Sequence, residues 1–168
     1  RPMRYVNLGQ SGLKVSVISL GSWITFGDSV DRDVTASCVR TAVEHGMFTV
    51  DTADIYARGK AEEVLSHAIK PYRRSDLVIA TKCFWPMTDN PNDKGLSRKH
   101  ITESVYASLK RLQVDYIDLM QCHRFDPETP VREVVETMGA LIRRGLILYW
   151  GTSVWTAAAA IQQVSRRE

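Results

Sequence analysis

The stretch TVDTADIYARGKAEEVL, from Thr49 to Leu65, contains the signals of a strand, a loop and a helix in succession. Its first residues continue an apolar run, which predicts a buried strand. The helix is predicted by apolar residues at helical spacing, namely Ala61, Val64, Leu65, Ala68 and Ile69. Between the two, the strand stops at Asp51 and Tyr56 follows five residues later. A buried strand that ends in a carboxylate indicates a functional site rather than a surface turn.

The same alternation extends through the chain in both directions. Five apolar, β-branched runs predict strands, and their starts are roughly thirty to forty residues apart. They are VSVISLG from Val15, FTVDT from Phe48, LVIATK from Leu77, YIDLMQCH from Tyr116 and LILYWGTS from Leu146. A helical pattern follows each run, so the sequence predicts five strand–helix units.

Local signals mark where several of these helices begin and end. The clearest apolar stripe starts at Val131, and we expect Thr129 to cap this helix with Pro130 in its first position. Gly145 is suited to the left-handed residue after that helix, and Gly46 to the same place after the first helix. A last helix is expected from about Thr156 to the C-terminus.

Repeated strand–helix units with continuous apolar strands predict a parallel sheet covered by helices, which leaves two architectures. A doubly wound nucleotide-binding sheet needs a glycine-rich turn after its first strand, but the segment there, GSWITFG from Gly21, lacks the GxGxxG spacing. The sequence therefore favours an α/β fold of the (β/α)8 TIM-barrel type. We expect one domain over residues 1–168 that contains about the first five βα units.

Polar side chains stand where the predicted strands end. They are Asp51 after the second strand, Lys82 after the third, His123 after the fourth and Ser153 after the fifth, with Tyr56 in the loop after the second. In a (β/α)8 barrel the working residues stand at the C-terminal ends of the strands. This placement predicts an active site at that edge.

Composition restricts the class of protein. A net charge of +3, spread over 22 basic and 19 acidic residues without a long like-charge block, gives little support to binding nucleic acid or a membrane surface. No apolar run has the length of a membrane span. Cys38, Cys83 and Cys122 lie far apart without metal-ligand spacing, so we expect free thiols, a cytoplasmic location and no metal.

The quoted segments, together with GLSRKHITESVYASLKRLQVDYIDLMQCHRFDPETP and LYWGTSVW, resemble the aldo-keto reductases, especially the subgroup that includes voltage-gated potassium-channel β-subunits. The resemblance implies a (β/α)8 barrel that binds NADP(H) and reduces small aldehydes or ketones. It carries the family's catalytic tetrad onto Asp51, Tyr56, Lys82 and His123. It also implies an N-terminal β-hairpin in RYVNLGQSGLKVS, and cofactor contacts from Ser22, Trp23, Asp51 and Ser153.

The chemistry of carbonyl reduction accounts for these residue types. The reaction needs a proton donor beside the growing alkoxide, and Tyr56 has a phenol for that role. A lysine ammonium favours the tyrosinate left after donation, and a carboxylate keeps a buried lysine charged, which fits Lys82 and Asp51. Taken singly, each has a structural interpretation: an Asp51–Lys82 ion pair, a half-buried Tyr56 and a structural His123. Cys83 and Cys122 are expected to pack rather than react.

Departures from the family pattern also carry information. Tyr56 is followed by Ala57 where many reductases have glycine, and Val154 replaces the asparagine of the family's Ser-Asn-Trp segment. Channel β-subunits have asparagine at the position of His123, so this histidine favours a working reductase over a channel regulator. The regulator stays open as an alternative.

Length is the largest departure, because a (β/α)8 barrel takes roughly 250 residues. The last three strands are expected to be absent, which leaves a truncated product, a fragment, or a chain completed by another copy as alternatives. We expect self-association through exposed strand edges. A catalytically inert fragment is the third functional alternative.

Overall fold

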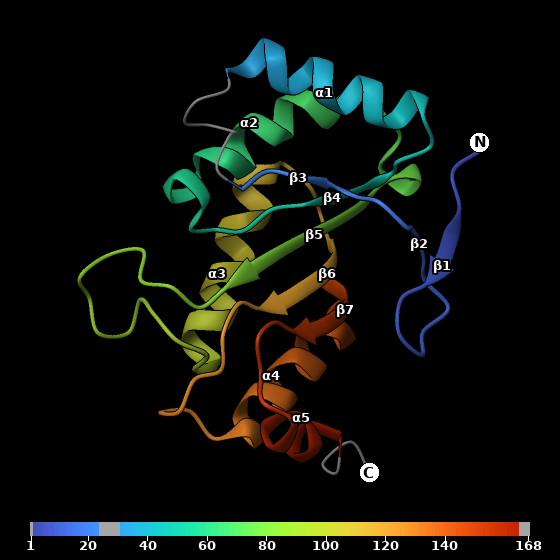
Figure 1. Ribbon diagram of the computed structural model, residues 1–168. Helices are drawn as coiled ribbons and strands as arrows, with labels where there is room; N and C mark the ends of the chain where they lie inside the picture. The colour runs from blue at the N-terminus through green and yellow to red at the C-terminus, as the bar shows by residue number, and fades with distance from the viewer. Residues whose placement is uncertain (1, 24–30, 165–168) are drawn as a thin grey trace. The chain divides into compact units, whose positions relative to one another are not determined.

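The computed structural model describes residues 2–23 and 31–164 (Figure 1). In this part of the chain the elements are β1 (Tyr5–Asn7), β2 (Lys14–Ser16), β3 (Leu20–Gly21), α1 (Arg32–Glu44), β4 (Thr49–Asp51), η1 (Tyr56–Gly59), α2 (Lys60–Ile69), η2 (Arg74–Asp76), β5 (Val78–Cys83), α3 (Arg98–Leu112), β6 (Ile117–Cys122), α4 (Val131–Arg143), β7 (Ile147–Thr152) and α5 (Ala157–Val164). The strand order is β3-β4-β5-β6-β7 in a parallel sheet. Five βα units behind an N-terminal hairpin are therefore confirmed.

The chain divides into two compact units, residues 1–80 and residues 81–168. In the first unit, β1 and β2 form the predicted antiparallel hairpin, with Tyr5 opposite Ser16. The prediction of one strand from Val15 to Gly21 is wrong, because the run is divided between β2 and β3. The Ser16 hydroxyl donates to the carbonyl of Ile18 at 2.6 Å, which closes a local turn between them. The side chain of Ile18 is correspondingly exposed.

Helices α1 and α2 lie side by side in this first unit (Figure 1). Asp31 caps α1 by accepting from the backbone N–H of Val34 at 2.9 Å. Gly46, at φ +79°, follows the helix in the predicted left-handed conformation. The two helices bury small and branched side chains, namely Val39, Ala42, Ala61, Leu65 and Ala68.

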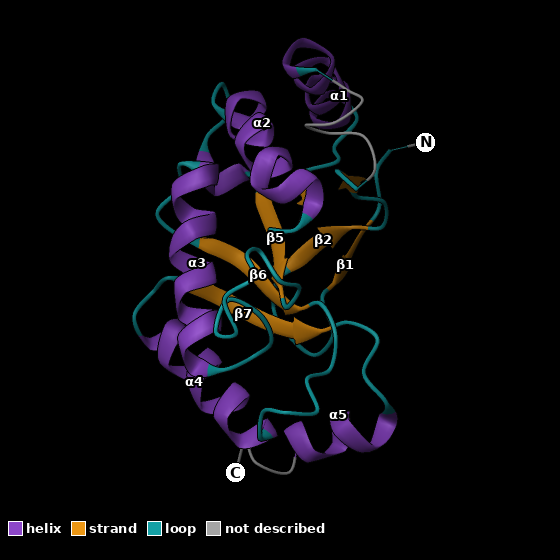
Figure 2. Ribbon diagram, turned by 90° about the vertical axis from the view of Figure 1, so that its left-hand side faces the viewer, coloured by secondary structure: helices purple, strands orange, loops and turns teal. Residues whose placement is uncertain are grey.

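Helices α3 and α4 lie side by side against β6 and β7 in the second unit (Figure 2). The prediction that Thr129 caps α4 is wrong, because the helix begins at Val131 and Pro130 is its cap. The Thr129 hydroxyl donates to Asp126 Oδ2 at 2.7 Å, so it serves the preceding loop. Gly145, at φ +72°, follows the helix as predicted. Helix α5 begins at Ala157, and residues 165–168 of the predicted last helix lie outside the described residues.

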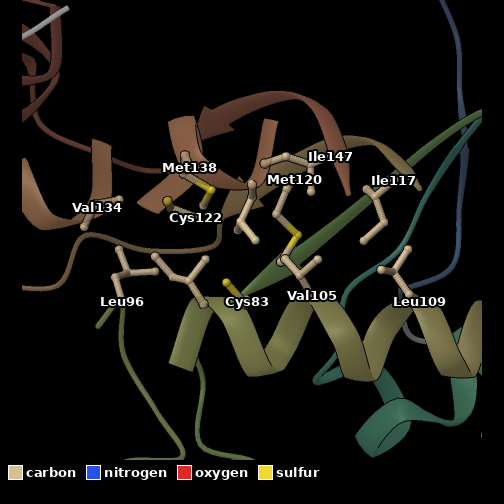
Figure 3. Packing of buried hydrophobic residues seen from close by; sticks show 12 residues of the cluster. Cys83, Leu96, Val105, Leu109, Ile117, Met120, Cys122, Val134, Met138 and Ile147 are labelled. Carbon is tan, nitrogen blue, oxygen red and sulfur yellow. The ribbon is translucent and has the colours of Figure 1, made fainter. Parts of the chain in front are cut away.

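The core of the second unit lies between these helices and the ends of β5, β6 and β7. Figure 3 shows the side chains pointing toward one another. The cluster comprises Cys83, Leu96, Ile101, Val105, Leu109, Ile117, Met120, Cys122, Val134, Met138, Leu141 and Ile147. Cys83 and Cys122 are fully buried in it as free thiols, and burial raises the pKa of Cys122 to about 12. Both cysteines pack, as the sequence predicts.

Asp126 holds two loops of the second unit together. Its Oδ2 accepts from the backbone N–H of Leu96 at 2.8 Å as well as from Thr129, and its Oδ1 accepts from the N–H of Glu128 at 3.0 Å. A Cβ added at Gly95 would meet Oδ2 at 2.6 Å. The carboxylate thus fixes the loop after β5 against the loop after β6.

No helix within residues 2–23 and 31–164 is long and apolar enough to cross a membrane. The single-domain assignment and self-association stay predictions.

We expect Gly95→Ala to lower the free energy of unfolding by more than Gly145→Ala does. Both glycines have a positive φ, so each alanine adds roughly 1 kcal/mol of backbone strain. Only at Gly95 does the methyl group also meet a neighbour, Asp126, whose hydrogen bonds must then distort at a further cost of roughly 1–3 kcal/mol. Urea unfolding of the two variants measures the difference. Equal losses would mean that the Asp126 contacts contribute little.

Candidate active site

The C-terminal end of β4 is fixed from both sides in the first unit. The backbone N–H of Ser22 donates to the carbonyl of Asp51 at 3.0 Å, and that of Thr52 donates to the carbonyl of Ala80 at 2.9 Å. Gly21 and Ala80 are the register partners of Asp51 on the two neighbouring strands. Parallel pairing thus continues to the strand end. It places the predicted site residues Ser22 and Asp51 on neighbouring segments of the chain.

Tyr56 is the first residue of η1, in the loop that follows β4. Its ring centroid lies 6.5 Å from that of Trp23, with an angle of 33° between the ring planes. Trp23 is exposed, whereas Tyr56 is half-buried. The first unit therefore brings together the predicted pairs Ser22 with Asp51 and Trp23 with Tyr56. The rest of the segment GSWITFG, residues 24–27, lies outside the described residues.

A left-handed turn follows Tyr56 directly. Ala57 and Arg58 have φ values of 49° and 51°, and Gly59, the residue before α2, has φ 89°. A residue with a Cβ costs roughly 1–2 kcal/mol in this conformation, so two in succession store strain beside the predicted proton donor. From the sequence, Ala57 is expected only as a substitution in the loop. The glycine at 59 was the signal of a left-handed turn.

Lys82 and His123 come from adjacent strands of the second unit. Lys82 is the penultimate residue of β5, and His123 follows the last residue of β6. The N–H of His123 donates to the carbonyl of Cys83 at 3.0 Å, so the two strand ends are in register. Ser153 is held in the same way, because its N–H donates to the carbonyl of Cys122 at 2.9 Å. Lys82 and His123 are both buried, and Ser153 is half-buried.

The pKa of His123 is lowered from 6.5 to about 4. Burial is the main cause, and the positive charges of Lys82 and Arg124 add to it. The imidazole is therefore neutral at pH 7. A neutral imidazole keeps one N–H donor, which suits hydrogen bonding to a carbonyl oxygen without proton transfer.

Sequence reasoning missed Trp85 and Arg124. The Trp85 ring meets that of His123 edge-on, with centroids 6.3 Å apart and planes at 75°. The guanidinium carbon of Arg124 lies 5.7 Å from the centroid of Trp85. The available signal was position, since Arg124 follows His123 and Trp85 comes three residues after Lys82, both at predicted strand ends.

The segment Ser153-Val154-Trp155 has a strained backbone at its central residue. Val154 has φ 56°, a conformation that β-branched residues rarely adopt, and its side chain is exposed. Asparagine tolerates this conformation better than valine does. The replacement noted in the sequence therefore removes an amide and adds backbone strain.

The predicted tetrad draws two residues from each unit. Asp51 and Tyr56 belong to residues 1–80, and Lys82 and His123 belong to residues 81–168. Within the second unit, the positive charge of Lys82 lowers the pKa of His123. The grouping of all four stays a prediction. Among the described residues, no group of three histidine, cysteine or acidic side chains could hold a metal ion.

Known proteins resemble this chain along most of its length. The sequence profile of the Aldo/keto reductase family matches residues 17–168. Two plant proteins, each named a probable voltage-gated potassium channel subunit beta, match 92% of the chain, at 51% identity in Arabidopsis thaliana and 48% in Oryza sativa subsp. japonica. The chain spans about half of each relative, 48% of its length.

The fold also matches a solved structure. A crystal structure of a thermostable aldo-keto reductase with the inhibitor epalrestat superimposes with a TM-score of 0.85 at 33% sequence identity. The match covers 98% of this chain and 58% of that protein. The predicted fold class, a partial barrel of the (β/α)8 type, is confirmed.

We expect the stability of the fold to fall between pH 6.5 and pH 4, and His123→Gln to reduce that fall. Unfolded His123 takes up a proton below its ordinary pKa of 6.5, whereas the folded residue does so only near pH 4. Acid therefore favours the unfolded state, by on the order of 2 kcal/mol at pH 5. Glutamine has no such proton to bind.

Thermal unfolding of both proteins at pH 7 and pH 5 measures the effect. Burial also lowers the pKa of His100, so the variant should keep part of the acid sensitivity. Parallel losses in the two proteins would mean that His123 titrates normally in the fold.

Proposed function

This chain belongs to the aldo/keto reductase family, and from that premise we propose that it reduces aldehydes or ketones to alcohols with NADP(H), using Tyr56 as the proton donor. The observation that carries the proposal is the buried Lys82 next to a neutral His123 at adjacent strand ends. A buried lysine is costly unless its charge serves a partner. A phenol that must release a proton is such a partner.

Each residue of the tetrad has a distinct role in the proposed reaction. His123 donates a hydrogen bond to the carbonyl oxygen and orients the substrate. Tyr56 gives its proton to the same oxygen as negative charge develops there. Lys82 lowers the cost of the tyrosinate that results, and Asp51 keeps Lys82 protonated.

The cofactor contacts in the proposal come from Ser22, Trp23, Asp51 and Ser153. Family members generally use NAD(P)H, and the dinucleotide supplies the hydride when bound. The Ser22 hydroxyl is buried, and it has no hydrogen-bond partner within the described part of the chain. A buried hydroxyl without a partner fits a carboxamide that needs one. Val154 offers no amide, so Ser153 is the polar side chain that its segment contributes.

A second candidate function rests on the names of the plant relatives. Both are named probable voltage-gated potassium channel beta subunits, which favours a regulator that binds cofactor as a sensor. Nucleotide-binding fluorescence followed by an assay with 4-nitrobenzaldehyde separates the candidates. Binding with turnover supports the reductase, and binding without turnover supports the regulator. The absence of both nucleotide binding and turnover supports a catalytically inert chain.

We expect Tyr56→Phe to lower carbonyl reduction at least a hundredfold, the scale of a lost general acid. Phenylalanine keeps the ring that contacts Trp23 and removes only the hydroxyl. Cofactor affinity should barely change. The assay is reduction of 4-nitrobenzaldehyde, with Tyr106→Phe on the exposed face of α3 as a matched control that keeps its rate. Near-normal turnover by the Tyr56 variant would exclude this residue as the donor.

Lys82→Met should be as damaging as Tyr56→Phe, and the double variant should be little worse than either. The ammonium acts through the phenol, so its effect disappears once the hydroxyl is gone. Comparing kcat/KM for the two single variants and the double variant measures the coupling. Losses that multiply would show that Lys82 acts apart from Tyr56, for example as one half of an ion pair.

A further inference from the structure

Arg124 is an arginine with unused hydrogen-bond donors next to a proposed catalytic residue. A guanidinium has five N–H donors. Among the described residues, Arg124 uses one of them, from Nη1 to the carbonyl of His123 at 2.6 Å. Within that part of the chain it makes no ion pair with a carboxylate. By contrast, Arg132 and Arg98 both pair with Glu136 on α4.

Asp126, the acidic residue nearest to Arg124 in the sequence, makes its hydrogen bonds to other residues. Asp126 is buried, and its two oxygens accept from Leu96, Glu128 and Thr129. Its negative charge therefore serves the two loops rather than Arg124. Among the described residues, Asp126 makes these hydrogen bonds and no ion pair with Arg124.

Trp85 holds the guanidinium in place. The cation lies over the indole at 5.7 Å from its centroid, and the same indole meets the ring of His123. Phe84 packs edge-on against Trp85, with centroids 4.9 Å apart, which fixes the indole from a second side. Stacking leaves the edge donors of a guanidinium available, so a planar anion can bind them in pairs.

Two cations act on the imidazole of His123. Lys82 and Arg124 both act on the imidazole as cations, since both lower its pKa. A ligand that reaches Arg124 thus meets a guanidinium that makes no ion pair among the described residues. Such a charge favours an anionic ligand over a neutral one of the same shape.

We propose that Arg124, held over Trp85, binds a carboxylate of the substrate, so that the preferred substrates are aldehydes or ketones that carry a carboxylate. This inference rests on the proposed reductase function. Reduction adds a hydride to the carbonyl carbon and a proton to its oxygen at the expense of one reduced dinucleotide. The carboxylate stays unchanged and serves only to position the substrate.

The test compares 4-carboxybenzaldehyde with its methyl ester, because the two share the ring and the aldehyde and differ in whether the opposite group is an anionic carboxylate or an uncharged ester. We expect the acid to have at least a tenfold higher kcat/KM, the scale of one charge-assisted hydrogen-bond pair. Arg124→Gln should remove this preference, so that the ratio of kcat/KM for the acid to kcat/KM for the ester falls to about one. Arg124→Lys should keep part of the preference.

Arg132→Gln is the matched control, since it removes the same charge from an exposed position on α4. It should leave the ratio of the two substrates unaltered. Equal rates for acid and ester in the parent protein would overturn the inference and leave the reductase function intact. An equal loss of kcat/KM for both substrates in Arg124→Gln would assign Arg124 a structural role, and it would also overturn the inference.

Binding of the product alcohols supplies a readout that needs no turnover. Isothermal titration compares 4-(hydroxymethyl)benzoate with its methyl ester in the parent protein, Arg124→Gln and Arg124→Lys. Carboxylate binding that depends on Arg124, with no reduction of either aldehyde, would support the anion site and overturn the proposed function. No difference between acid and ester in this titration would overturn the anion site.

Discussion

Backbone pairing that continues one residue past the strand ends is the constraint on which the candidate site depends. In the first unit, Ser22 donates to Asp51 in this way, and in the second unit His123 donates to Cys83 and Ser153 to Cys122. Each of these N–H groups belongs to a residue, or faces a residue, with a proposed function. A side chain one place along the strand would point to the other face, because the side-chain period of a strand is two. Lys82 and Cys83 illustrate this alternation, one charged and the other part of the apolar core.

Burial and charge then set the chemistry of these positions. His123 is neutral because it is buried, and the positive charges of Lys82 and Arg124 lower its pKa further. Asp126 contributes to the site indirectly, because its carboxylate accepts hydrogen bonds from backbone and hydroxyl donors of the loops. An acid left free beside Arg124 would pair with its guanidinium and neutralise the charge. The loops that carry these residues are thus held by a charge that the site itself does not use.

Sequence periodicity predicted the five strand–helix units well, because apolar spacing records which face of each element is buried. It failed where side chains bond to nearby backbone or to a neighbouring loop. Ser16 interrupts an apolar run that reads as one strand, and Thr129 serves Asp126 instead of capping α4. The resemblance supplied the tetrad, whereas Trp85 and Arg124 are defined by a stacking contact between two loops, which spacing alone does not encode. The left-handed turn at Ala57 was not predicted either, because alanine is not a residue typical of that conformation.

The burial of Cys83 and Cys122 has a consequence for the proposed reduction of carbonyl compounds. Aldehydes and enals are electrophiles, and the form of a cysteine that attacks them is the nucleophilic thiolate. With a pKa of about 12, the thiol of Cys122 holds its proton at neutral pH, and both sulfurs lie inside an apolar cluster. Burial thus keeps the Cys122 thiol protonated and both sulfurs away from solvent, which disfavours their reaction with carbonyl compounds and with peroxide. A site built this way resists poisoning by the compounds that it is proposed to consume.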